Sequence, residues 1–108
     1  WVSVPSNAVD GLDDFSVSVW FKTAVSKTQQ DIFHALGADT NDDELEIHLR
    51  DTNTVVVKVR DVERALASSI LLTDDNWHHL AIVRVDQNIC LFIDSAQQAC
   101  TTTASAGL

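Results

Sequence analysis

The chain has 108 residues, 45% of them hydrophobic, with one proline and three glycines. This length and composition indicate one globular domain with a modest core, and argue against a disordered chain. Sixteen acidic residues against seven basic ones give a net charge of −9 at pH 7, which argues against nucleic acid or an anionic membrane surface as a partner. No apolar run approaches the ~20 residues of a membrane-spanning helix, so no membrane insertion is expected.

The first third of the chain shows the period-2 alternation of half-buried strands. A short strand is predicted over 1–5, and a longer one over 15–23. In the longer strand the Val and Phe residues are predicted to face the core. Trp20 then lies on the opposite face.

The middle of the chain has the clearest alternation. Strands are predicted over 31–36, 44–50 and 54–60, the last two as an antiparallel hairpin. The inward row of the second strand is Leu45, Ile47 and Leu49, and its outward, solvent-facing row is Glu44, Glu46, His48 and Arg50.

The last third contains a second predicted hairpin. The run 61–66 is compatible with a short helical turn, and 69–73 with a further strand. Strands over 77–85 and 89–95 follow, joined by turn-forming polar residues. A final strand is predicted over roughly 97–103. Short strands at this spacing predict an all-β antiparallel sandwich.

The two cysteines, Cys90 and Cys100, flank a predicted hairpin turn. If that turn centres near Ser95, they lie opposite one another on paired strands, within reach of a disulfide. A disulfide is favoured over two buried free thiols, although free cysteines are also common in cores. It would place the protein in an oxidising compartment: extracellular, at the cell surface or periplasmic.

Three segments carry a family resemblance. Segment 77–85 begins with Trp-His-His and ends in Arg-Val, and 89–95 ends in Ile-Asp-Ser; segments 15–22 (FSVSVWFK) and 1–5 (WVSVP) precede them. In this order they resemble the laminin G-like group of the concanavalin A-like lectin/glucanase superfamily. The resemblance implies a jelly roll.

Complete domains of the resembled group run to roughly 150 residues or more. A trimmed laminin G-like domain lacking terminal strands is therefore expected over 1–108, with a minimal sandwich complete in itself as the alternative. The resemblance also makes the Trp-His-His start a fold element. In it Trp77 packs at the sandwich edge and one histidine bonds to a neighbouring strand.

Glu44, Glu46 and His48 share one strand face and form the first candidate site. Glucan-cleaving members of the superfamily carry a similar row of acids as nucleophile and acid/base. Here His48 stands where a third carboxylate would be needed, and retaining hydrolysis requires a carboxyl pair. A solvated polar row is the favoured interpretation, a ligand-binding surface the second, and a glycoside hydrolase using Glu44 and Glu46 the least favoured.

The acidic run 39–44 is the second candidate site. Calcium takes six to eight hard oxygen ligands, which clustered Asp and Asn side chains provide. The resemblance points the same way, because many domains of that group hold calcium in rim loops. The EF-hand spacing is absent, and a plain solvated loop is the alternative. The candidate calcium ligands are Asp39, Asn41, Asp42 and Asp43.

The remaining candidates are histidines and tryptophans. Adjacent strand residues point to opposite faces, so His78 and His79 are not expected to share a metal, and no zinc site is predicted. Of the three tryptophans, only Trp20 is expected to be exposed, where it could stack on a sugar ring.

The sequence thus predicts a non-catalytic recognition or adhesion module, for example of a bacterial adhesin or pilus component. It would bind carbohydrate or extracellular protein through rim loops, with calcium as the candidate cofactor. The alternative is a structural or assembly spacer without a ligand site.

Overall fold

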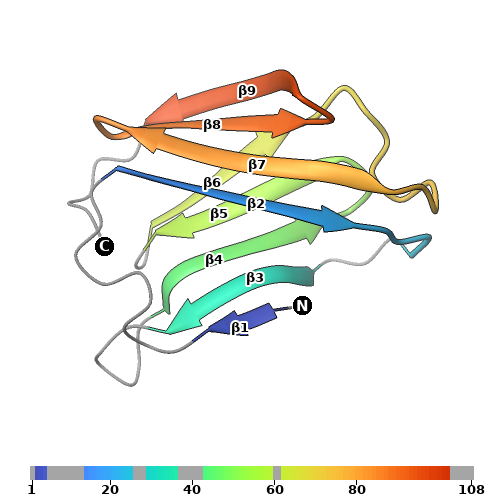
Figure 1. The fold of residues 1–108 in the computed structure, drawn as a ribbon, viewed down its shortest axis with the longest axis horizontal. Helices are drawn as coiled ribbons and strands as arrows, with labels where there is room; N and C mark the ends of the chain where they lie inside the picture. The colour runs from blue at the N-terminus through green and yellow to red at the C-terminus, as the bar shows by residue number, and fades with distance from the viewer. Residues whose placement is uncertain (1, 5–13, 26–28, 37–42, 60–61, 103–108) are drawn as a thin grey trace.

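The computed structural model describes residues 2–4, 14–25, 29–36, 43–59 and 62–102, and these ranges form a sandwich of two β-sheets (Figure 1). The described residues contain strands and turns but no helix. The predicted all-β sandwich is therefore confirmed.

The first sheet has five strands in the order β1-β3-β4-β5-β6. Its strands β3 to β6 pair in antiparallel fashion, whereas β1 runs parallel to β3. The bounds are β1 Val2–Val4, β3 Gln30–Leu36, β4 Asp43–Arg50, β5 Thr54–Val59 and β6 Val62–Ala67.

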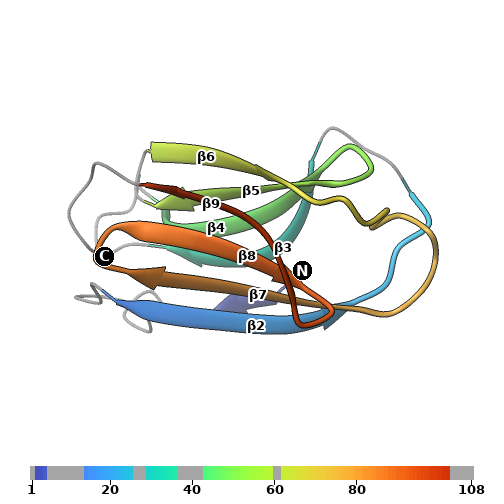
Figure 2. The ribbon, with the colours of Figure 1, turned by 90° about the horizontal axis from the view of Figure 1, so that it is seen from above.

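The second sheet has four antiparallel strands in the order β2-β7-β8-β9. Figure 2 shows the two layers from above, with β6 of one sheet beside β9 of the other. There the Arg64 Nε donates a hydrogen bond to the Thr102 carbonyl at 3.0 Å. The bounds are β2 Phe15–Phe21, β7 His78–Val85, β8 Asn88–Ile93 and β9 Ala96–Thr102.

The core lies between the sheets and follows the alternation read from the sequence. In β7 every second residue from His78 to Arg84 is buried, and in β4 the inward row is fully buried as predicted. The hydrophobic row of β2 packs against this core and Trp20 faces away from it, as predicted. The buried aliphatic core of the strands is Ile32, Ala35, Leu45, Ile47, Leu49, Val55, Val57, Val59, Leu66, Leu80, Ile82, Ile89, Leu91 and Ile93.

Two predicted elements are wrong. The run 61–66, compatible in sequence with a short helical turn, lies from Val62 onward in the strand β6, whose six residues all pair with β5. The predicted strand over 69–73 is irregular. Its Leu72 amide bonds instead to the Thr52 carbonyl of the β4–β5 turn at 2.9 Å, and the amide of Ser68, just before this segment, bonds to the Asn53 carbonyl at 2.8 Å. These bonds fix Leu72, whose side chain is fully buried.

The predicted disulfide joins Cys90 of β8 to Cys100 of β9. The two residues are direct register partners with Cα atoms 4.1 Å apart. The bond therefore ties together the last hairpin of the described chain.

Both hairpins of the four-stranded sheet turn through two residues with positive φ. Asp86 and Gln87 have φ of 49° and 71°, and Asp94 and Ser95 have φ of 51° and 70°. Two consecutive positive φ values are the signature of a type I′ turn, whose twist matches that of the flanking strands. Glycine is the usual second residue of this turn, and neither hairpin has it.

Replacing Ser95 by glycine should therefore raise the free energy of unfolding by about 1 kcal/mol, since glycine takes a left-handed conformation without steric cost. Urea unfolding followed by tryptophan fluorescence measures the change. The matched control is Ala96→Gly, one residue later in β9, which should lower stability by roughly 0.5–1 kcal/mol. Destabilisation by Ser95→Gly would contradict the turn assignment.

Candidate functional site

The predicted ligand-binding residues lie on two different sheets. Trp20 belongs to β2 and faces outward from the four-stranded sheet, whereas Glu46 and His48 belong to β4 of the five-stranded sheet and face away from the core. The core separates the two groups, so they do not form one site. The side chain of Glu44, the fourth predicted residue, lies outside the described part of the structure.

The outer face of the four-stranded sheet carries an aromatic patch, defined here as Trp20, His79 and Trp77. Trp20 is the register partner of His79, and their rings lie 5.1 Å apart at an angle of 57°. Trp77 stands two residues before His79. The side chains of Trp20 and Trp77 are both 63% exposed. Three aromatic rings thus meet solvent at the β2–β7 end of this sheet.

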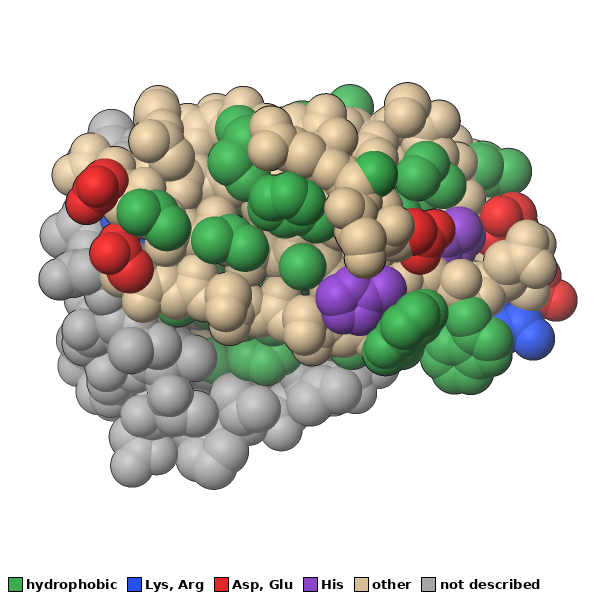
Figure 3. Space-filling model, turned by 45° about the horizontal axis from the view of Figure 1, so that its top comes forward, with side chains coloured by type: hydrophobic (Ala, Val, Ile, Leu, Met, Phe, Trp, Pro, Cys, Tyr) green, Lys and Arg blue, Asp and Glu red, His purple; other side chains and the backbone are tan. Residues whose placement is uncertain are grey.

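Exposure of Trp77 corrects the prediction that it packs at the sandwich edge. His78, the next residue, points into the core, so alternation turns Trp77 outward. Figure 3 views the four-stranded sheet, and hydrophobic side chains are spread over it with a histidine among them. Further along this face Val83, Cys90 and Phe92 are half-buried.

The outer face of the five-stranded sheet carries a polar cluster, defined here as Gln29, Asp31, Glu46 and His48. The Nδ1 of His48 lies 3.0 Å from Glu46 Oε1. The Gln29 amide nitrogen donates to Glu46 Oε1 at 2.9 Å and to Asp31 Oδ1 at 3.0 Å. A single amide thus bridges two carboxylates.

The burial of Glu46 and His48 corrects the prediction of a solvent-facing row. Glu46 and His48 are only 7% and 4% exposed. Their polar atoms tolerate burial because they bond to one another and to Gln29. Sequence reasoning missed Asp31, which joins the cluster because β3 and β4 pair it with His48. The one available signal was its position at the start of a strand that pairs with β4.

The predicted calcium ligands cannot be placed. Asp39, Asn41 and Asp42 lie outside the described residues, as does the side chain of Asp43. The one group of metal-ligating side chains found among the described residues is Asp31, Glu46 and His48. It fits calcium poorly, because calcium takes six to eight oxygen ligands and this group offers two carboxylates and an imidazole.

The buried His78 forms a hydrogen-bond network with two more exposed carboxylates at the start of β7. Its Nδ1 lies 2.9 Å from Asp94 Oδ2 and its Nε2 lies 2.8 Å from Asp74 Oδ1. Asp94 also accepts a hydrogen bond from the His79 amide at 2.9 Å. One histidine was predicted to bond to a neighbouring strand, whereas both partners of His78 lie outside the strands, Asp74 in the loop before β7 and Asp94 in the β8–β9 turn. It connects the loop before β7, β7 itself and the β8–β9 turn.

The network shifts the pKa of each member toward the charged form. Burial opposes the charge of His78, but the hydrogen bonds to Asp94 and Asp74 and their negative charges outweigh it and raise the pKa of this imidazole. The hydrogen bond from His78, with that from Asn76, lowers the pKa of Asp74 to about 2. The His79 amide, followed by His78, lowers the pKa of Asp94. The pair of bonds to His78 therefore describes an imidazolium between two carboxylates.

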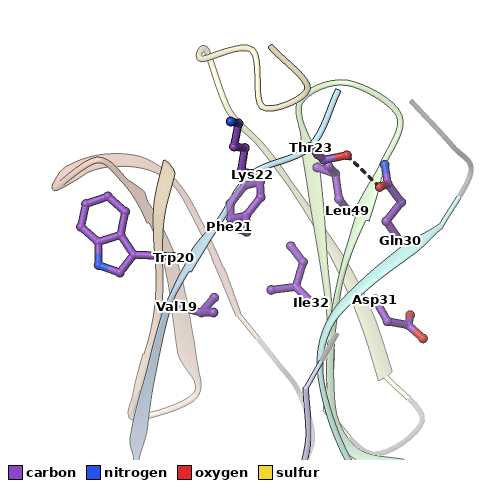
Figure 4. A pocket seen from close by; sticks show the side chains of 9 residues that line it. All are labelled: Val19, Trp20, Phe21, Lys22, Thr23, Gln30, Asp31, Ile32 and Leu49. Atoms are coloured by element: carbon purple, nitrogen blue, oxygen red, sulfur yellow. Dashed lines mark hydrogen bonds between the residues drawn. The ribbon is translucent and has the colours of Figure 1, made fainter. Parts of the chain in front are cut away.

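A pocket of about 260 Å³ opens between β2 and β3. Figure 4 shows Val19, Phe21 and Ile32 directed into the space between the two strands, whereas the Trp20 indole points away from it. Thr23 and Gln30 close one side through a hydrogen bond of 3.1 Å. The lining therefore mixes apolar side chains with Lys22, Gln30 and Asp31, and it includes Trp20 of the aromatic patch, whose ring is directed away from the pocket.

No segment within the described residues is a helix long and apolar enough to cross a membrane.

Comparisons with known proteins identify the family. A laminin G family model, described as "Concanavalin A-like lectin/glucanases superfamily", matches residues 1–107. A search of curated protein sequences gave no significant match. Among solved structures, domains LG4-5 of the mouse laminin alpha1 chain match with a TM-score of 0.71 and 13% identity over 95% of this chain. The chain spans only 27% of that structure's length. This protein belongs to the concanavalin A-like lectin/glucanase superfamily, as a laminin G-like domain.

Proposed function

We propose that this domain is a non-catalytic recognition module of a secreted or cell-surface protein, and that it binds neutral carbohydrate through the aromatic patch. The observation that carries the proposal is the exposure of Trp20 beside His79. An indole is a flat apolar surface on which the C–H face of a sugar ring can stack. The imidazole of His79 can exchange hydrogen bonds with sugar hydroxyls.

The charge of the chain selects among glycans. At a net charge of −9 the domain repels anionic ligands at long range. Sulfated or carboxylated glycans are therefore disfavoured, and neutral oligosaccharides are the expected class.

The family context supports a recognition role. Laminin G-like domains commonly act as adhesion or recognition modules, and their homologues are extracellular. The Cys90–Cys100 disulfide is suited to an oxidising compartment. We infer an extracellular, cell-surface or periplasmic location.

The burial of Glu46 supports a non-catalytic role. A retaining glycosidase needs two carboxyls that flank a bound sugar. Glu46 is 7% exposed and already bonds to His48 and Gln29. A sugar could reach it only after these contacts were broken.

The test is binding to an array of neutral oligosaccharides, followed by titration of the best ligand. Trp20→Ala should weaken binding at least about tenfold, which is 1.4 kcal/mol, because the stacking surface is lost. Trp20→Phe should retain part of the affinity, because a smaller aromatic face remains.

The matched control is Leu71→Ala, which removes an exposed hydrophobic side chain, 51% exposed, outside both sheets. Its affinity should equal that of the wild type. Running the array with calcium and with chelator tests the predicted ligands Asp39, Asn41, Asp42 and Asp43. Absence of glycan binding, or undiminished binding by Trp20→Ala, would contradict the proposal and favour a protein ligand or a spacer role.

A further inference from the structure

We infer that Asp31, Glu46 and His48 form a binding site for a divalent transition-metal ion such as Zn²⁺. The ligand atoms of these three side chains all lie within 4.8 Å of one another. They come from two paired strands, β3 and β4, so a single ion could contact all three. The site lies on the opposite sheet from the aromatic patch.

The strands fix the three side chains in place. Asp31 and His48 are direct register partners, and Glu46 stands two residues before His48 on the same face of β4. The register shifts between Asp31 and Phe33. Such an irregularity re-aims the side chains beside it and is common next to functional sites. Ligands held on strands are positioned more firmly than ligands on loops.

The cluster brings two carboxylates to one amide group. The side chains of Glu46 and His48 are 10% and 5% exposed, so the carboxylate has little solvent to stabilise it. The neutral amide of Gln29 supplies the contact between Asp31 and Glu46, at 3.0 and 2.9 Å. Its nitrogen lies within hydrogen-bond distance of both carboxylates. Lys58 of β5 stands opposite Glu46 in the strand register. A divalent ion between Asp31 and Glu46 would neutralise both carboxylates directly, which an amide cannot do.

The ligand types favour zinc over calcium. Imidazole is a ligand of zinc and of other first-row transition metals, and zinc sites combine histidine with carboxylates in tetrahedral geometry. Three protein ligands leave a fourth position. Water could take it, or Gln29 could rotate its amide so that the oxygen replaces the nitrogen. Calcium takes six to eight oxygen ligands, which is more than two carboxylates supply.

The experiment is calorimetric titration of chelator-treated protein with Zn²⁺, and separately with Ca²⁺. The wild type should bind one zinc ion per chain, more tightly than calcium. Asp31→Asn and His48→Gln should each weaken zinc binding at least about tenfold, because each removes a ligand. The matched control is Glu63→Gln. It removes an exposed carboxylate of β6 on the same sheet face, and should bind zinc as the wild type does.

Melting temperature provides a second readout and shows that the variants fold. Zinc at a hundredfold excess over its Kd should raise the Tm of the wild type by about 10 °C, and should raise that of Asp31→Asn much less. With Co²⁺ in place of zinc, a visible absorption band should form in the wild type and fade in His48→Gln. The inference is overturned if the wild type binds no zinc, if folded Asp31→Asn binds it with unchanged affinity, or if calcium binds more tightly.

Discussion

Replacing both cysteines by serine should lower the free energy of unfolding by about 3 kcal/mol. Cys90 and Cys100 are ten positions apart, and closing so short a loop in the unfolded chain removes conformational entropy worth about that amount. The change should lower the Tm by about 12 °C. Urea unfolding at equilibrium and a thermal melt measure the two quantities.

A reductant is the matched control for this substitution. It should destabilise the wild type by a similar amount and leave the Cys90→Ser/Cys100→Ser variant unchanged. A loss below about 1 kcal/mol in the double variant would contradict the prediction. It would mean that β8 and β9 stay paired in the unfolded chain without the disulfide, so that the bond removes little conformational entropy.

Replacing His78 by leucine should lower the free energy of unfolding by about 2 kcal/mol. The substitution leaves the carboxylates of Asp74 and Asp94 without their imidazole partner. Breaking a fully buried ion pair costs roughly 3–5 kcal/mol. The loss expected here is smaller, about 2 kcal/mol, because both carboxylates are partly exposed. His79→Gln, a change at the adjacent outward-facing histidine, should alter stability by less than about 0.5 kcal/mol.

The same network predicts how stability depends on pH. The raised pKa of His78 gives stability that is complete below its ordinary value of 6.5 and is lost as the pH rises through the raised value. The lowered pKa of Asp74 gives stability that is present above its ordinary 3.8 and is lost as the pH falls toward about 2. The network should therefore contribute most between about pH 4 and 6.5.

Denaturant unfolding across this pH range tests the prediction. The difference in unfolding free energy between the wild type and His78→Leu should be largest between those two limits and should shrink on either side. A difference that stays constant with pH would show that His78 stabilises the fold by packing alone.

The sheet faces could be predicted from the sequence because period-2 alternation is a local signal. It separated the inward row of β4 from Glu46 and His48, and it placed Trp20 on the outer face of β2. Alternation does not say how deeply an outward residue is covered. For that reason Glu46 and His48 were expected to be in solvent.

The elements that could not be predicted depend on pairing between distant segments. Strand β6 forms because β5 accepts it as a partner, and a six-residue run gives too little periodicity to separate a strand from a helical turn. The position of Asp31 beside His48 depends on the β3–β4 register, including its shift. Neither the pairing of β6 with β5 nor the position of Asp31 beside His48 can be read from one of the two segments alone. Calcium binding by the loop 39–43 stays a prediction.

The position of β2 in its sheet has a consequence for how the chain folds. β2 pairs with β7, from Phe15 opposite Arg84 to Phe21 opposite His78, so more than half of the chain separates the partners. During synthesis β2 emerges long before β7, and its Val and Phe row has no sheet to join until β7 follows. Pairings this distant in sequence slow folding, and unpaired strands with apolar faces are prone to association. Docking of β2 onto β7 is therefore the expected slow step, and low temperature and low chain concentration should favour recovery of the native domain.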